Sequence, residues 1–152
     1  SFTNINHNAR EVDIHTPYDT TLLVLNERLN KTYIGYGTLG FANTVRQGEL
    51  DKAYYKMSNE TASKRVAAKA QSNVYNNAGW DMVDANRADS NFVSKMDRSS
   101  LPDSLKNKST AQLQQYIKQK TDERSGIQKE IALISDQSHM GKVHPNHLWR
   151  TI

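Results

Sequence analysis

The sequence predicts a mainly α-helical fold: a helical bundle that follows one short strand near the N-terminus. Three observations lead to this prediction. Apolar residues recur at helical spacing over most of residues 20–136. The 152 residues include only 3 prolines and 7 glycines, too few for a turn-rich all-β domain. Only one segment alternates with period two. The hydrophobic fraction is 36% and the mean hydropathy is −0.79, so we expect a small core.

The alternating segment is AREVDIHTP. Val12 and Ile14 would lie on one face of a strand and Asp13 on the other, and Pro17 closes the run. A single short strand is not stable alone, and no second convincing strand follows it. The sequence therefore indicates that the sheet lies outside this chain or lacks its other strands.

The stretch TPYDTTLLVLNERLNKTYIGYG predicts a turn and then a helix. Pro17 makes the turn, and Asp19 or Thr20 is expected to cap the helix. Gly35 and Gly37 are expected to end it. The apolar stripe of this helix consists of Leu22, Leu23, Val24, Leu25 and Leu29.

A long helix is predicted over residues 41–76, broken near Ser58 and Asn59. A turn at 77–79 then leads into a short helix over 80–86. We expect the first residue of that helix, Trp80, to be buried, because a small core needs a large side chain. The inward stripe of the long helix is expected to be Ala53, Tyr54, Met57, Ala62, Val66, Ala70 and Val74.

The last third of the sequence predicts a loop over 91–109 and a final helix from residue 110 to about 136, capped by Ser109 or Thr110. A polar gap between residues 118 and 126 indicates that this helix extends past the core or packs at two separate patches. The loop is expected to touch the core through Phe92, Val93, Met96 and Leu101. The stripe of the helix is Leu113, Tyr116, Ile117, Ile127, Ile131 and Ile134.

Several motifs resemble one family. The most specific are TPYD…LN..L..TYIGYG and Y.N.GWD.VDA, accompanied by RQGELDKA, LPDSL and KTDERSGIQKEIALIS. They make residues 1–137 similar to the C-terminal region of exported bacterial proteins with a von Willebrand factor type A domain. The resemblance implies that residues 1–16 are the last strand of a type A-like α/β domain and that residues 17–137 are a helical C-terminal module. It also implies a periplasmic or extracellular location.

Type A domains hold a metal through an Asp-x-Ser-x-Ser motif, and the resemblance implies that any such site lies upstream of residue 1. The nearest string, DRSSL at 97–101, has leucine at the fifth position, so we interpret it as a turn and cap. GYGTLG at 35–40 has the spacing of a dinucleotide fingerprint but follows a helix rather than a strand. We therefore expect no cofactor-binding or metal-binding residues and no cofactor.

Two acid pairs could supply a general acid and base, Asp81 with Asp84 and Asp122 with Glu123. The sequence places no nucleophile or oxyanion donor beside them, so we expect no catalytic residues. The charge of +4 suggests a nucleic-acid partner, but basic residues alternate with acidic ones, as on a solvated surface. We expect no nucleic-acid partner, and the sequence has no apolar run long enough to span a membrane.

Residues 138–152 break the family pattern. SHM resembles the remnant of a cloning vector, so this tail is vector-derived, a fused peptide or native sequence. Its histidines, His139, His144 and His147, could bind zinc or nickel but lack a carboxylate or cysteine partner. We predict that the tail is separate from the helical fold and contacts either a groove on this domain or a neighbouring chain. The residues able to do so are Val143, Leu148, Trp149 and Ile152.

Together these observations predict a non-enzymatic protein-interaction or scaffolding module of a larger exported bacterial protein. Its partner would be another protein or the upstream type A domain. One alternative is a peptide-binding domain that holds its own C-terminal segment. A metal-dependent enzyme and a nucleic-acid binder are further alternatives that the residue patterns favour less.

Overall fold

The computed structural model describes residues 16–143, with side chains described for 16–137. This part of the chain is mainly helical and contains no strand, which confirms the predicted fold class at that level. An isolated antiparallel bridge joins Gly35 to Asp81. The strand expected at residues 12–14, the last strand of a type A-like domain, lies outside the described residues.

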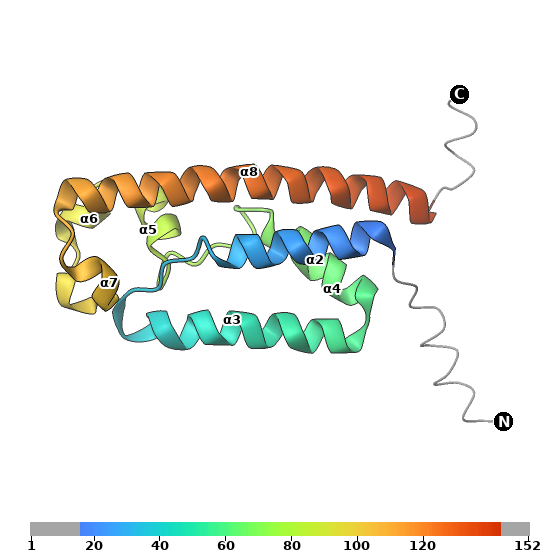
Figure 1. Cartoon of the computed structure of the whole chain (residues 1–152), viewed down its shortest axis with the longest axis horizontal. Coiled ribbons are helices and arrows are strands. Elements are labelled where there is room, and N and C mark those ends of the chain that lie inside the picture. Colours follow the sequence, from blue (N-terminus) through green and yellow to red (C-terminus); the bar gives the residue numbers. More distant parts are fainter. Residues whose placement is uncertain (1–15, 144–152) are drawn as a thin grey trace.

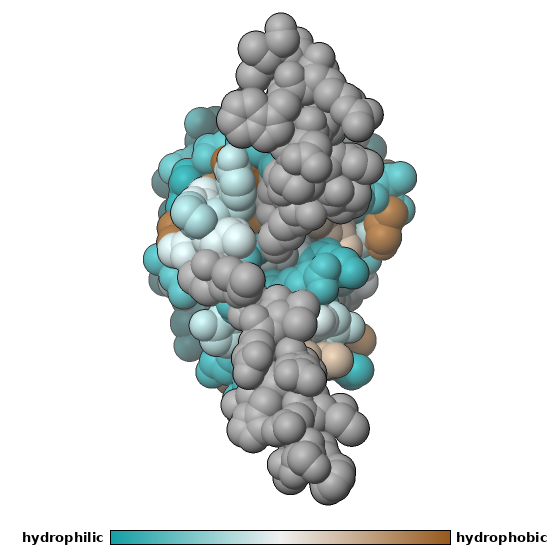
Figure 2. Space-filling model, turned by 90° about the vertical axis from the view of Figure 1, so that its right-hand side faces the viewer, coloured by the Kyte–Doolittle hydropathy of each residue, from teal (hydrophilic) through white to brown (hydrophobic). Residues whose placement is uncertain are grey.

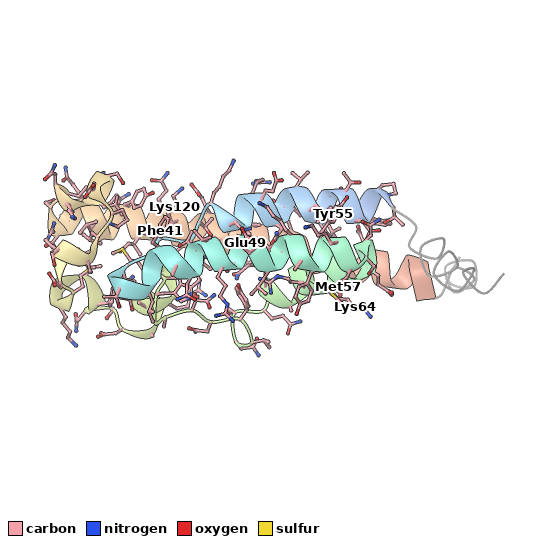
Figure 3. The ribbon with its side chains drawn as sticks, turned by 90° about the horizontal axis from the view of Figure 1, so that it is seen from below. Phe41, Glu49, Tyr55, Met57, Lys64 and Lys120 are labelled. Atoms are coloured by element: carbon pink, nitrogen blue, oxygen red, sulfur yellow. The ribbon has the colours of Figure 1, made fainter. Side chains whose placement is uncertain are left out.

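The longest helices of the described range run in alternating directions and form a bundle (Figure 1). They are α2 (Pro17–Asn30), α3 (Gly37–Met57), α4 (Asn59–Lys69) and α8 (Thr110–Val143). Short helices gather where α8 begins: α5 (Met82–Ala88), α6 (Phe92–Lys95) and α7 (Asp103–Lys106), with a 3-10 turn at Arg98–Ser100. Figures 1 and 3 together show α3 and α8 on opposite sides of the layer that α2 and α4 make.

The start of α2 is fixed by a capping box. Thr16 Oγ1 accepts a hydrogen bond from the Asp19 backbone N–H at 3.1 Å, and the Asp19 carboxylate accepts one from the Thr16 N–H at 3.1 Å. The predicted cap at Asp19 or Thr20 is therefore wrong by three or four positions. The helix ends at Asn30, before the glycines that were expected to end it.

Those glycines instead make a close crossing between the α2–α3 connection and α3. A Cβ on Gly35 would lie 2.8 Å from the Gly40 carbonyl oxygen, and a Cβ on Gly40 would lie 2.7 Å from the Gly35 carbonyl carbon. Gly37 has φ +71°, in the left-handed region that favours glycine. GYGTLG is thus a backbone-packing motif at the start of α3.

The predicted break at residue 58 is confirmed. Ser58 has an extended backbone, and its hydroxyl accepts from the Thr61 N–H at 2.9 Å, which caps α4. The helix before the break starts at Gly37 rather than at 41, and the helix after it ends at Lys69 rather than at 76.

The apolar core has two parts. One cluster, among α2, α4 and α8, consists of Leu22, Leu25, Leu29, Tyr33, Val66, Trp80, Ile127 and Ile131. The other, under α5–α7, consists of Ile34, Met82, Val83, Val93, Leu101, Leu105, Leu113 and Ile117. Helix α8 therefore contacts the core at two patches, which is one of the two alternatives that the polar gap in its stripe left open. Trp80 is buried, as predicted, and stacks on Tyr33 with ring centroids 5.7 Å apart.

Helix α8 continues to Val143, seven residues beyond its predicted end near residue 136. The boundary proposed at residue 137 therefore does not coincide with the end of this helix. Leu148, Trp149 and Ile152, the tail residues expected to make contacts, lie outside the described residues, and so does the side chain of Val143.

Candidate functional site

Helix α3 exposes large apolar side chains. Phe41 is 82% exposed and Met57 71% exposed, and Leu39, Val45 and Tyr55 are exposed as well. In Figure 3, Phe41 and Tyr55 lie on the side of α3 nearest α2, and Met57 lies on the side of α4. Figure 2 views the bundle from the end where α2 begins, and there the described surface is mainly hydrophilic with apolar patches at its edges.

The predicted inward stripe is therefore wrong over α3. Tyr54 and Met57 on α3 are exposed, although Ala62 and Val66 on α4 are buried as predicted. Val74, which follows α4, is exposed as well. The buried residues of α3 are Gly40 and Gln47, neither of which brings a large apolar side chain to the core. Something other than apolar burial must hold this helix against the bundle.

That role is filled by a polar cluster centred on Asp51. Its carboxylate accepts hydrogen bonds from Asn26 at 3.0 Å, Asn30 at 2.7 Å and Arg65 at 2.7 Å. Lys69 Nζ lies 3.2 Å from the same carboxylate. One α3 side chain thus joins α2 and α4, and hydrogen bonds to a charged group are worth about 1.5–3 kcal/mol each.

Lys69 is the most deeply buried member of the cluster. Its side chain is 0% exposed, and Nζ donates to Asn26 Oδ1 and to Asn30 Oδ1, both at 2.7 Å. Gln47 extends the cluster by donating to Asn30 and by accepting from the Tyr75 hydroxyl. Every N–H of the ammonium group therefore has an acceptor, which is what a buried cation requires.

Burial and charge act in opposite directions in this cluster. Burial lowers the pKa of Lys69 to about 8, although the Asp51 carboxylate opposes that shift. Burial also disfavours ionised Asp51, but Lys69 and the hydrogen bonds from Asn30, Asn26 and Arg65 outweigh it and hold the pKa of Asp51 below its usual value. The cluster therefore holds an ion pair near neutral pH.

A groove of about 450 Å³ lies above this cluster, between α2 and α3. Its walls include Leu23, Glu27, Gly48, Lys52, Tyr55 and Lys56. A Cβ on Gly48 would meet no atom within 4 Å, so packing does not require a glycine there. Glycine inside a helix costs about 1 kcal/mol relative to alanine, and here it leaves part of a groove wall bare.

The first acid pair lies in a buried ion cluster. Arg124 Nη1 lies 2.7 Å from the Asp81 carboxylate and 3.2 Å from that of Asp84. Its Nε donates to Thr32 Oγ1 at 2.9 Å, and its guanidinium lies 3.8 Å from the centroid of the Tyr33 ring. This cation fills the polar gap in the stripe of α8 and separates the two apolar clusters.

Asp81 and Asp84 have structural roles. Asp81 accepts from the Ile34 N–H at 2.8 Å and caps α5 through the Asp84 N–H at 3.0 Å. Burial raises the pKa of Asp84, whose carboxylate also accepts from the Asn77 N–H. Sequence reasoning missed Arg124, although it lies seven residues after Ile117 and therefore on the buried face of the helix.

The remaining candidates lie elsewhere. Asp122 and Glu123 are on the surface of α8, where they pair with Lys118 at 3.1 Å and Lys120 at 3.3 Å. The DRSSL string forms a 3-10 turn in which Asp97 caps the backbone, as interpreted from the sequence.

Residues 16–137 contain no group of three or more histidine, cysteine or acidic side chains that could hold a metal ion. The side chain of His139 lies outside the described residues, as do His144 and His147. None of the helices described is both long and apolar enough to cross a membrane. Comparisons with known protein families, curated proteins and solved structures find no match for this chain.

Proposed function

We propose that residues 17–137 form a non-enzymatic protein-interaction module of a larger exported bacterial protein with a type A domain. The observation that carries the proposal is the outer surface of α3. Phe41 is 82% exposed on a helix that is itself held by polar contacts. Exposed large apolar side chains that gather on one element are typical of protein-binding surfaces.

The groove beside α3 supports the same proposal. It combines apolar surface from Leu23 and Tyr55 with the charged side chains of Glu27, Lys52 and Lys56 at its walls. A mixture of apolar and charged side chains is common on peptide- and helix-binding surfaces. The groups on which the enzyme alternative relied, Asp81 and Asp84, are engaged by Arg124 and by backbone N–H groups.

Site-specific photo-cross-linking in the producing bacterium tests the proposal. A photoreactive phenylalanine at position 41 should cross-link a protein, and the same residue at position 133 should not. Leu133 is the matched control because it is 60% exposed on α8, on the opposite side of the bundle (Figure 1). Equal cross-linking at both positions, or none at position 41, would contradict the proposal.

A further inference from the structure

One flank of α3 carries a seam of residues with the spacing that lets a second helix pack along it. The seam consists of Phe41, Val45, Gly48, Lys52 and Tyr55, at intervals of four, three, four and three residues. At 100° per residue these positions fall within about 80° of one another. Figure 3 shows both ends of the seam, Phe41 and Tyr55, on the side of α3 nearest α2. The three large apolar members, Phe41, Val45 and Tyr55, are all exposed.

The groove between α2 and α3 lies beside this seam. Gly48, Lys52 and Tyr55 belong to its α3 wall, and Leu23 and Glu27 belong to its α2 wall. A Cβ on Gly48 would meet no atom within 4 Å, so the middle of the α3 wall leaves room for a side chain from another molecule. The groove therefore extends the exposed apolar surface of the seam onto α2.

The walls of the groove favour a helix as the occupant. The backbone N–H and C=O groups of an α-helix are bonded within that helix, so α2 and α3 offer no backbone partners to an extended peptide. A helix that enters the groove brings its own backbone groups already bonded, and it can lay one apolar face along the seam.

The charges on the rim of the groove are unpaired. Lys52 and Lys56, one turn apart on α3, have no ion-pair partner in the described part of the chain, and neither has Glu27 on α2. Like charges one turn apart on a helix repel each other. By contrast, Lys118 on α8 pairs with Asp122 one turn away. A carboxylate from another molecule would therefore relieve a repulsion that the described residues leave in place.

The acidic side chains of the groove do not cancel this positive charge. The Asp51 carboxylate, which also lines the groove, already pairs with Arg65 and Lys69. Glu27 then stands as one unpaired carboxylate against the two unpaired ammonium groups of α3. The groove therefore presents an excess of positive charge to an occupant.

We propose that the groove and seam bind an amphipathic helix of another protein that carries acidic residues along the edges of its apolar face. The apolar face packs on Leu23, Val45 and Tyr55, and the carboxylates pair with Lys52 and Lys56. The distance from the first to the last residue of the seam requires a partner helix about 21 Å long. The inference rests on the proposed function and names the chemistry of the partner.

The same charges argue against a second copy of α3 as the occupant. A second α3 seam would bring Lys52 and Lys56 of its own into the groove, so that four ammonium groups would share one site. Arg46 and Glu49 lie further outward on α3 and do not line the groove. Charge complementarity therefore selects a different, acidic helix.

Fluorescence anisotropy of the full chain with two labelled synthetic peptides tests the proposal. Both peptides are stapled helices of about 16 residues with leucines at alternating spacings of three and four, long enough to cover the seam. One carries glutamates along both edges of the leucine stripe, and the other carries lysines at the same positions. A single short helix buries a small interface, so we expect the glutamate peptide to bind with a Kd in the micromolar range and the lysine peptide at least about tenfold more weakly.

A charge reversal in the chain locates the preference. The double variant K52E/K56E should bind the lysine peptide more tightly than the glutamate peptide, because the sign of the groove wall is reversed. The control is K64E/K129E, which changes the net charge equally but on α4 and α8, at two exposed side chains. It should keep the preference for the glutamate peptide.

Filling the groove tests the site itself. Gly48→Leu places a side chain where the partner helix is expected to pack, and it should weaken binding of the glutamate peptide at least about tenfold. Gly126→Leu is the matched control, because Gly126 lies on α8 and a Cβ at either glycine would meet no atom within 4 Å. It should leave the affinity unchanged, and circular dichroism checks that every variant keeps its helices.

Equal affinity for the two peptides overturns the inference, and so does the absence of binding by either peptide up to about 1 mM. Full binding by Gly48→Leu overturns it too, because the peptide would then bind elsewhere on the chain.

The photo-cross-linking experiment separates this inference from the proposed function. A cross-link from position 41 to another protein, together with equal affinity for the two peptides, supports the proposed function and rejects the acidic helix. The expected peptide preference without any cross-link from position 41 contradicts the proposed function alone. A cross-link from position 41 to a second copy of the chain overturns the inference, because another copy would then occupy the seam.

Discussion

Replacing Arg124 with methionine tests whether its ion cluster joins the two halves of the core. The substitution keeps much of the side-chain volume but leaves the buried Asp81 carboxylate without its cation and Asp84 with only the more distant Arg87, at 4.0 Å. Breaking a buried ion pair from one side costs about 3–5 kcal/mol. Arg124 is 1% exposed, so solvent cannot replace the lost contacts. We expect the free energy of unfolding to fall by about that amount.

Urea denaturation followed by circular dichroism at neutral pH measures this loss. Lys118→Met is the matched control, because Lys118 is on the same helix, is 69% exposed and pairs with Asp122. It should change the free energy of unfolding by less than about 0.5 kcal/mol. Arg124→Lys should recover only part of the stability. Arginine contacts Thr32 and both carboxylates at once through the planar fork of its guanidinium, and the single ammonium group of lysine cannot do so.

The pH dependence of the loss identifies its cause. Burial already raises the pKa of Asp84, and the loss of Arg124 removes a charge that opposes this shift, so the folded R124M chain binds a proton at Asp84 more readily and its deficit should shrink as the pH falls from 7 towards 4. A deficit below about 1 kcal/mol at pH 7 would refute the electrostatic reasoning. A deficit of the expected size that does not change with pH would attribute it to packing instead.

Three further outcomes are expected. Trp80→Ala should lower the free energy of unfolding by about 3–5 kcal/mol in urea titrations, because it empties the site beside Tyr33; a loss below about 1 kcal/mol would contradict this. Gly126→Ala should raise thermal stability by up to about 1 kcal/mol, because a Cβ there meets no atom within 4 Å; a fall in the melting temperature would argue against it. The lowered pKa of Lys69 makes the unfolded chain bind more protons between about pH 8 and 10.5, so stability should rise with pH from 8 to 10. That slope should be absent in Lys69→Met.

Local patterns in the sequence were enough to predict most of the helices. The break near Ser58 and the stripe of α8, with its polar gap, were visible in the spacing of apolar residues, and the burial of Trp80 was expected because a small core needs a large side chain. These signals depend on residues that are close together in the sequence, so they can be recognised without knowledge of the tertiary structure.

The sequence alone did not determine which side of α3 faces the core. Its apolar residues were expected to point inward, but the helix is held by Asp51, whose partners Asn26, Arg65 and Lys69 lie 14 to 25 residues away in the chain. A polar side chain can face the core only where its partners converge on it, and that convergence depends on the tertiary structure. The burial of Arg124 has the same origin, since Asp81 lies 43 residues away.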